Sequence, residues 1–141
     1  MIRLVFFNRQ RSQPFNTRAV RECACRAVPD LLSAARKGSA LLGLSVVEVV
    51  YVSPARICEV HGEFFGDPSP TDVITFPYGE ILICPGVAAD NARRFRRTVE
   101  EEVSLCVIHG ILHLAGWDDT HPRSAAAMAR RQEEILAACR T

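Results

Sequence analysis

The feature that most constrains the fold of this chain is the segment from Val103 to Leu114, which is apolar nearly all round. Just before it, Thr98 and Glu101 have the spacing of a capping box, in which each side chain bonds the backbone of the other and a helix begins. A helix with no polar face has to be surrounded by other elements. We therefore predict a central, buried helix that starts at Thr98 and that Gly116 ends.

The rest of the sequence divides into short strands and amphipathic helices. Runs of β-branched and aromatic residues predict strands, and apolar residues that recur every three or four positions predict helices. The expected strands are residues 2–8, 44–52, 72–78 and 80–84. The expected helices are residues 16–37 (bent or split at Pro29), 54–64, about ten residues from Pro85, 98–114 and 123–139. This order favours an α+β fold in which a small mixed sheet of about four strands packs with five or so helices.

Composition adds limits on size and environment. Of the 141 residues 48% are hydrophobic, which is enough for one core, so we expect a single domain over residues 1–141. The formal net charge is +1, so nucleic-acid binding would need a local patch. The apolar run from Leu4 to Phe7 is too short for a signal peptide or a membrane span, and we expect a cytoplasmic protein with no membrane partner. The six cysteines lack framework spacing and are expected to be reduced and buried.

His109 and His113 are four residues apart on the central helix, so both imidazoles lie on one face. Two histidines in an apolar helix are hard to satisfy with internal hydrogen bonds, and a shared metal ion would satisfy both. Because Gly116 turns the chain back, the third ligand should follow it, and the spacing selects Asp119. Three protein ligands leave a fourth position for water, as in catalytic zinc sites. We expect one Zn²⁺ per chain, although the same donors accept nickel, iron or manganese.

The ligand spacing matches the metzincin frame H-E-x-x-H-x-x-G-x-x-H, with Asp119 in place of the last histidine. In that frame a glutamate follows the first histidine and acts as general base, and Gly110 replaces it here. No carboxylate then occupies the position that deprotonates the attacking water, which argues against a metallopeptidase. His121 remains the alternative third ligand, and Asp118 is expected to point away and to cap the turn or orient a ligand.

Two stretches of the chain carry longer motifs. PTDVITFPYGEILI covers residues 70–83, and HGILHLAGWDD covers residues 109–119. Together they resemble the YbeY family of bacterial rRNA maturation factors, whose patterns are P-T-[DN]-V-[LI]-[ST]-F-P, G-[DE]-I and H-G-x-L-H-L-x-G-[YW]-D-H. The resemblance runs from about Val46 to Leu136. It implies an α+β, zincin-like fold and one zinc ion bound by the helix and the turn.

The resemblance also implies an activity and partners. The family is described as a single-strand-specific endoribonuclease in 16S rRNA 3′-end maturation and ribosome quality control. Single-stranded RNA, 16S rRNA and the ribosome or its small subunit are the partners that it implies. On this basis we expect His109, His113 and Asp119 to be both the metal ligands and the catalytic residues.

Two departures from the family patterns bear on the function. Asp119 replaces the last histidine of the second motif, and aspartate is also a side chain that binds metals. The family segment L-N-x-x-[YW]-R-G reads VHGEFFG here, so Phe65 replaces an arginine that is thought to support RNA cleavage or binding. This replacement favours a second hypothesis, a non-catalytic zinc-containing ribosome biogenesis factor that binds rRNA or a ribosomal protein.

Basic and aromatic side chains outside the motifs are candidates for RNA contact. Cleavage of a phosphodiester needs cations for the charge that develops, and arginine is a frequent contact of phosphate. The candidate arginines are Arg56, Arg93, Arg94, Arg96 and Arg97. A solvated helix face is the alternative for the RRFRR run. The aromatic candidates for base stacking are Phe64, Phe65, Tyr78 and Trp117, with core or cleft wall as the alternative.

Four polar residues around the first motif are expected to line a cleft or to support the ligands. Thr71 and Asp72 end a polar loop at an edge of the sheet, where the alternative is a turn cap. Thr75 lies on the following strand, where it could reflect β propensity alone. Glu80 begins the next strand and is a candidate general base.

Overall fold

The computed structural model describes residues 2–140. Four strands form one mixed sheet in the order β1-β2-β4-β3. The strands are β1 (Arg3–Asn8), β2 (Val46–Tyr51), β3 (Val73–Phe76) and β4 (Glu80–Ile83). β1, β2 and β4 are parallel, and β3 runs antiparallel to β4 at the edge of the sheet.

The α-helices in the described residues are α1 (Thr17–Ala34), α2 (Pro54–Phe65), α3 (Pro85–Phe95), α4 (Val99–Leu114) and α5 (Pro122–Cys139). A 3₁₀ turn, η1 (Ala40–Gly43), precedes β2. The predicted α+β class, with about four strands in a mixed sheet and five or so helices, is confirmed. Within the described part of the chain, none of these helices combines the length and the hydropathy needed to cross a bilayer.

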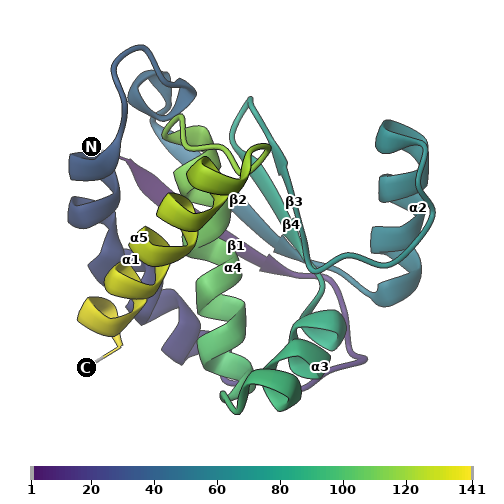
Figure 1. Cartoon of the computed structure of the whole chain (residues 1–141). Helices are drawn as coiled ribbons and strands as arrows, with labels where there is room; N and C mark the ends of the chain where they lie inside the picture. The colour runs from purple at the N-terminus through teal and green to yellow at the C-terminus, as the bar shows by residue number, and fades with distance from the viewer. Residues whose placement is uncertain (1, 141) are drawn as a thin grey trace.

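Helix α4 lies at the centre of the molecule, as predicted. It contacts α1, α3, α5, β3 and β4, and Figure 1 shows it between α5 and the sheet. The Thr98 side chain accepts a hydrogen bond from the Glu101 backbone, and the Glu101 carboxylate accepts one from the Thr98 backbone, so the predicted capping box is present. Gly116, with a φ of +93°, adopts the left-handed conformation that glycine favours at the end of a helix.

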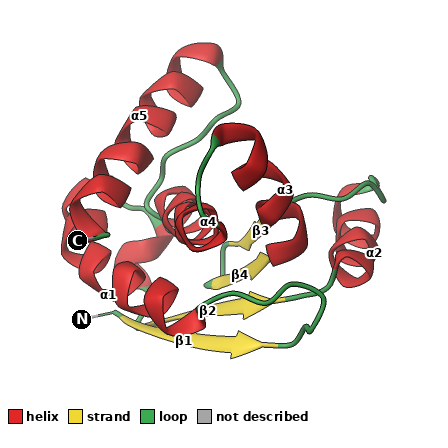
Figure 2. Ribbon diagram, turned by 90° about the horizontal axis from the view of Figure 1, so that it is seen from below, coloured by secondary structure: helices red, strands yellow, loops and turns green. Residues whose placement is uncertain are grey.

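The two faces of the sheet are covered differently. Helices α1, α4 and α5 lie over one face, and α2 stands apart from them (Figure 2). Because side chains alternate along a strand, Val49 and Ile81 join the main core beneath the helices, whereas Val50 and Leu82 face the other way. A smaller core forms there with Ile57 and other residues of α2.

Helix α1 differs from its predicted range. It ends at Ala34 instead of Lys37, and Pro29 lies inside it without splitting it. Ala27 and Leu31, on either side of the proline, are both buried in the main core. This packing stabilises the helix across the position where proline removes one backbone donor.

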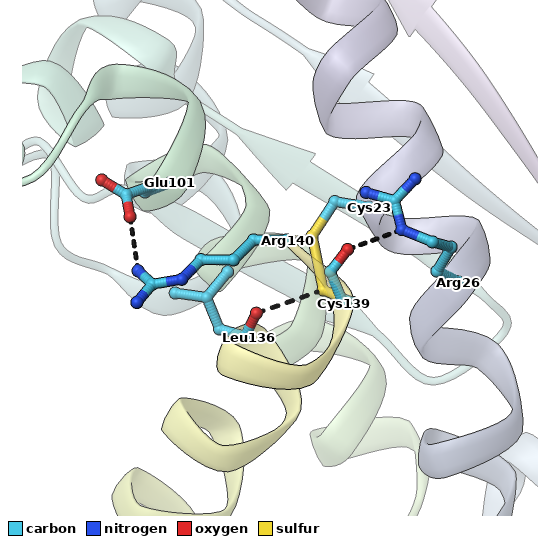
Figure 3. Close-up of a disulfide and its surroundings, with 6 residues drawn as sticks. All are labelled: Cys23, Arg26, Glu101, Leu136, Cys139 and Arg140. Atoms are coloured by element: carbon cyan, nitrogen blue, oxygen red, sulfur yellow. Dashed lines mark hydrogen bonds and ion pairs between the residues drawn. A yellow bond between two sulfur atoms is a disulfide. The ribbon is translucent and has the colours of Figure 1, made fainter.

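The prediction of reduced cysteines is wrong for two of the six. Cys23 of α1 and Cys139 at the end of α5 form a disulfide (Figure 3), although 116 residues separate them. Arg26 donates a hydrogen bond to the carbonyl of Cys139 (2.6 Å), so the same two helices are joined twice. Sequence spacing did not indicate the pair because the fold, and not the local sequence, brings the two helices together.

The other four cysteines are free thiols. Cys84 and Cys106 are buried as predicted, and burial raises the pKa of both thiols. Cys58 is only half-buried and Cys25 is exposed, so the prediction of burial is wrong for Cys25. Cys25 lies on the outer side of α1, which does not face the core.

Candidate metal centre

Three side chains converge where α4 ends. His109 and His113 are one turn apart on α4, and their Nε2 atoms are 3.1 Å from each other. Oδ2 of Asp119 lies 3.7 Å from Nε2 of His109 and 3.6 Å from Nε2 of His113. One ligand atom from each of the three residues lies within 4.8 Å of the others, so the group could hold a metal ion.

Hydrogen bonds on the far side of each ring orient the two histidines. Nδ1 of His109 donates to Oε1 of Gln132 on α5 (2.8 Å), and Nδ1 of His113 donates to the carbonyl of Trp117 (3.1 Å). Because an amide or backbone carbonyl oxygen only accepts hydrogen bonds, each Nδ1 carries a proton. In a neutral ring, Nε2 then presents a lone pair. Two lone pairs at this distance repel each other unless a proton or a cation lies between them. The donor set therefore fits a divalent cation.

The lowered pKa of His113 also favours metal binding. Burial lowers the pKa of His113, and the positive charge that His109 can carry lowers it further. The carboxylate of Asp119 acts in the opposite direction but does not cancel these two effects. The neutral ring, which is the form that binds metals, is thereby favoured.

The turn after α4 brings Asp119 back to the histidines. Trp117 anchors this turn, because its Nε1 donates to the carbonyl of Ala34 (2.9 Å) and its ring lies under the guanidinium of Arg36, 4.3 Å from the ring centroid. These contacts attach the turn to the end of α1. The position of Asp119 thus depends on packing between segments that are far apart in the sequence.

Two neighbours of Asp119 stay outside the group. The Asp118 carboxylate accepts hydrogen bonds from the backbone and hydroxyl of Thr120 and from the hydroxyl of Ser124, and these bonds lower the pKa of Asp118. Asp118 therefore stabilises the turn that leads into α5. His121 occupies the N-cap position of α5, but its side chain makes no capping bond. It is exposed and is not among the three converging residues.

A cavity of about 490 Å³ opens over the three side chains. Residues of the loop before β3, of β3 itself, of α2 and of α4 line it. Of the predicted cleft residues it contains Thr71, Asp72 and Thr75. Asp72 accepts a hydrogen bond from the amide of Asn91 (3.3 Å), and the Cys106 thiol lies 3.7 Å from the same carboxylate.

Gly110 sets the distance between α4 and the sheet. A Cβ atom at this position would lie 2.8 Å from Cδ1 of Ile81 and 3.1 Å from Oγ1 of Thr75. Neither distance leaves room for a larger side chain. At the position where metzincins have the general base, α4 here packs directly against the sheet.

The structure does not bring the other predicted residues to this cavity. Glu80 accepts a hydrogen bond from the Tyr78 hydroxyl and, with Arg56, lines a separate groove on the side of the sheet that faces α2. Arg56 also pairs with Glu59. Glu80 projects from β4 on the opposite face to Ile81, which explains why it lies away from α4.

The four arginines near the end of α3 are also outside the cavity. Arg93 pairs with Asp90, and Arg97 pairs with Glu133 and lies 3.9 Å from Glu102. Arg94 and Arg96 are exposed. The RRFRR run is thus divided between ion pairs within the fold and free surface charge.

The aromatic candidates are more exposed than core residues. Phe64, Phe65 and Tyr78 are 61%, 57% and 67% exposed, so an interpretation as core is wrong for these three. Phe65 lines the cavity above the histidines, and Phe64 and Tyr78 line the groove on the other side. Trp117 is partly buried and serves as the anchor described above.

Sequence reasoning missed two side chains of this site. Gln132 bonds His109 from α5, and no motif marks it. His61 of α2 lines the same cavity as the three converging residues. It is the one histidine of the four outside the second motif and its flank, and it stands where the family segment L-N-x-x-[YW]-R-G has asparagine, which was the signal in the sequence.

A helix buried against a mixed sheet, with two histidines and a returning aspartate beneath a cavity, defines an α+β domain with a site that could hold a metal ion. The family model described as Endoribonuclease YbeY matches residues 6–140. The chain therefore belongs to the YbeY family, as its motifs predicted.

Individual relatives agree with this assignment. The chain is 44% identical over 97 residues to the Endoribonuclease YbeY of Thermotoga sp. (strain RQ2), with 64% of this chain and 65% of that protein covered. It is 34% identical over 119 residues to the Endoribonuclease YbeY of Chlorobium luteolum, with 79% and 83% covered. The chain thus spans slightly less than two thirds of the Thermotoga protein.

A solved structure is also similar. The solution structure of TM1509 from Thermotoga maritima matches with a TM-score of 0.63 and 30% sequence identity. The match covers 95% of this chain and 87% of that protein. The common fold thus extends over regions in which the sequences have diverged.

Proposed function

We propose that this chain is a zinc-dependent, single-strand-specific endoribonuclease that acts in 16S rRNA 3′-end maturation and ribosome quality control. It would work in the cytoplasm, on single-stranded RNA and 16S rRNA, together with the ribosome or its small subunit. The names of the YbeY relatives support the activity. His109, His113 and Asp119 are the proposed ligands of one Zn²⁺ ion and the core of the catalytic site.

The convergence of the three ligand atoms beneath an open cavity carries this proposal. A zinc ion held there would supply a Lewis acid that stabilises negative charge on a phosphate oxygen. The protein's own part is orientation. Gln132 and the Trp117 carbonyl fix the two rings, and the packed turn brings Asp119 to them. The loop before β3 also lines the cavity, and the Thr71 hydroxyl is a candidate donor to a bound phosphodiester.

A second function, a non-catalytic zinc-containing biogenesis factor that binds rRNA or a ribosomal protein, is favoured by one observation. No lysine or arginine is among the described residues that line the cavity, and Phe65 lies in its wall. Phosphoryl transfer commonly uses such a cation for the charge of the transition state. A binding protein would keep the metal for structure and would not need one.

A metallopeptidase has less support. Peptide hydrolysis in the metzincin manner needs a carboxylate at position 110, and a side chain there would collide with Ile81. The short distance between α4 and the sheet thus opposes this activity independently of the motif.

The test is cleavage of labelled single-stranded and double-stranded RNA by zinc-loaded protein. We expect the wild type to cut the single strand, and Asp119→Ala and His113→Ala to lose the cut together with the zinc. His121→Ala is the matched control, because this exposed histidine lies two residues from Asp119 and outside the group. Cleavage unchanged in both ligand variants would rule out the metal mechanism. Binding to small ribosomal subunits without any cleavage would instead support the non-catalytic factor.

A further inference from the structure

We propose that His61 is the proton donor of this site, which protonates the ribose oxygen that leaves when the RNA phosphodiester is cleaved. This inference rests on the proposed endoribonuclease function. It concerns a residue on α2, outside both motifs, and it gives the chain a catalytic group that its ligand set does not contain. Four observations lead to it.

The first observation is the place of His61 in the cavity. His61 lines the same cavity as His109, His113 and Asp119, and it comes from a different element, α2. Figure 1 shows that α2 and α4 are separate helices with the edge strand β3 between them. A substrate that fills this cavity would therefore have the ligand group at one wall and His61 at another.

The second observation is the orientation of the ring. Nδ1 of His61 donates a hydrogen bond to the backbone carbonyl of Ser69, at 2.8 Å. Because a carbonyl only accepts, Nδ1 keeps its proton and Nε2 is the nitrogen that can gain or lose one. Nε2 makes no hydrogen bond to any residue that the structure describes. The ring is therefore fixed by one nitrogen and free to react through the other.

The third observation is that the loop after α2 and a neighbouring ring restrict the movement of this imidazole. A Cβ atom on Gly62 would lie 3.4 Å from Cα of Pro68, so the loop returns close to the helix. The imidazole also contacts the ring of Phe65, with 5.8 Å between the ring centroids. A proton donor that is held in this way loses little conformational entropy when the substrate binds.

The fourth observation concerns the other titratable groups. Those that line the cavity are His61, Asp72 and the three proposed ligands. Asp72 is already bonded to Asn91 and lies beside the Cys106 thiol. From the loop, the Asp67 carboxylate faces His61, but it is exposed and accepts hydrogen bonds from Ser69. Within the described part of the chain, His61 is thus the only lining histidine that is not among the proposed ligands.

The chemistry assigns a definite proton path. Hydrolysis forms a P–O bond to the oxygen of water and breaks the P–O bond to the leaving ribose oxygen. That oxygen takes the proton from Nε2 of the His61 imidazolium and departs as an alcohol. The proton that the attacking water releases passes to solvent, from which the neutral imidazole is protonated again. Histidine is the side chain that most often transfers a proton in enzymes.

The test compares two substrates in zinc-loaded protein. Single-stranded RNA has a leaving oxygen that needs a proton, whereas bis(4-nitrophenyl) phosphate releases a stable anion that needs none. For His61→Ala we expect kcat on RNA to fall by about 100-fold, within the usual range of general acid catalysis. On the nitrophenyl ester the rate should stay within about twofold of wild type, as expected when no proton is required. Zinc content should remain at that of the wild type.

A second variant separates proton transfer from support of the loop. His61→Gln can still donate to the Ser69 carbonyl, but it cannot act as an acid. It should therefore be as stable as the wild type and as slow on RNA as His61→Ala. Glu63→Gln, an exposed change on the same helix, is the matched control and should cut RNA at the wild-type rate.

The outcomes are distinct. Equal losses on both substrates, or RNA cleavage that does not depend on His61, would overturn the inference and leave the proposed function intact. Failure of the zinc-loaded wild type to cut any single-stranded RNA would remove the proposed function, and this inference with it. A loss confined to RNA, with zinc retained, is the result that we expect.

Discussion

The two faces of the sheet bear similar kinds of side chain, yet only one assembles a site. On the face that α4 covers, His109, His113 and Asp119 bring three ligand atoms within 4.8 Å of one another. The groove on the face toward α2 has a similar volume, about 440 Å³, and contains carboxylates, arginines and aromatic rings. In the described residues no second group of three potential ligands converges as the first one does.

The difference lies in what stands behind each face. The histidines project from a buried helix whose neighbours fix both rings, so their free nitrogens point to one place. Glu80 and Arg56 are instead held by exposed partners, Tyr78 and Glu59, which could equally be replaced by water. Polar residues form a site when packing fixes the direction of their side chains. Exposed ion pairs of this kind contribute little to the free energy of unfolding.

The largest effect that would test this contrast is loss of the metal. We expect about one zinc per chain in the wild type, and almost none in His109→Ala after dialysis, because the remaining two donors hold the ion weakly. Asp119→Ala should lose more zinc than His121→Ala. Elemental analysis of the purified proteins measures this directly. The reverse order for the last two variants would make His121 the third ligand.

The next effect concerns the bond behind His109. Residues that orient a metal-binding histidine typically change metal affinity by about 10-fold to 100-fold when they are removed. We expect Gln132→Ala to weaken zinc binding within this range, as measured by competition with a chelator. Gln132→Glu keeps an acceptor for Nδ1 and should bind zinc at least as tightly as the wild type. Equal affinity in Gln132→Ala would mean that His109 needs no support from α5.

A smaller effect is expected from the contact between α4 and the sheet. In Gly110→Ala the new methyl group would lie 2.8 Å and 2.9 Å from two carbons of Ile81. Overpacking of this kind costs about 1–3 kcal/mol of the free energy of unfolding, of which the better helix propensity of alanine offsets a part. Gly43→Ala is the control, since a Cβ there meets nothing within 4 Å. Urea unfolding that leaves Gly110→Ala as stable as the wild type would contradict the close packing.

These predictions depend on residues that the sequence revealed unequally. Helix α4, its capping box and Gly116 could be predicted because each is set by residues within a few positions of one another. The pairing of His109 with His113 follows from helix periodicity alone. Asp119 needed only the further assumption that the chain turns back, and the structure brings it to the histidines.

The residues that sequence reasoning missed depend on tertiary contacts. Gln132 reaches His109 across 23 positions, and Cys23 reaches Cys139 across 116. Glu80 was misplaced for another reason. A strand presents alternate residues to opposite faces, and the sequence does not say which set faces the site. Ile81 faces α4, so Glu80 lies on the other side.

The smallest effect tests the face toward α2, where Glu80 holds the Tyr78 hydroxyl. This hydrogen bond and the negative charge of Glu80 keep the proton on the phenol and raise the pKa of Tyr78 to about 12. The other tyrosine of the chain, Tyr51, also has a raised pKa because it is buried. Neither tyrosine of the wild type should therefore ionise near the ordinary value of about 10.

In Glu80→Ala the pKa of Tyr78 should fall toward that ordinary value. The ultraviolet absorbance of tyrosinate reports this change, and circular dichroism checks that the fold persists. Glu59→Ala, an exposed change on α2, should leave the titration as in the wild type. Zinc content and RNA cleavage should be the same in Glu80→Ala and in the wild type, because Glu80 faces away from the cavity. If cleavage were lost while zinc stayed bound, Glu80 would act as a base at the metal centre, and the contrast between the two faces of the sheet would not hold.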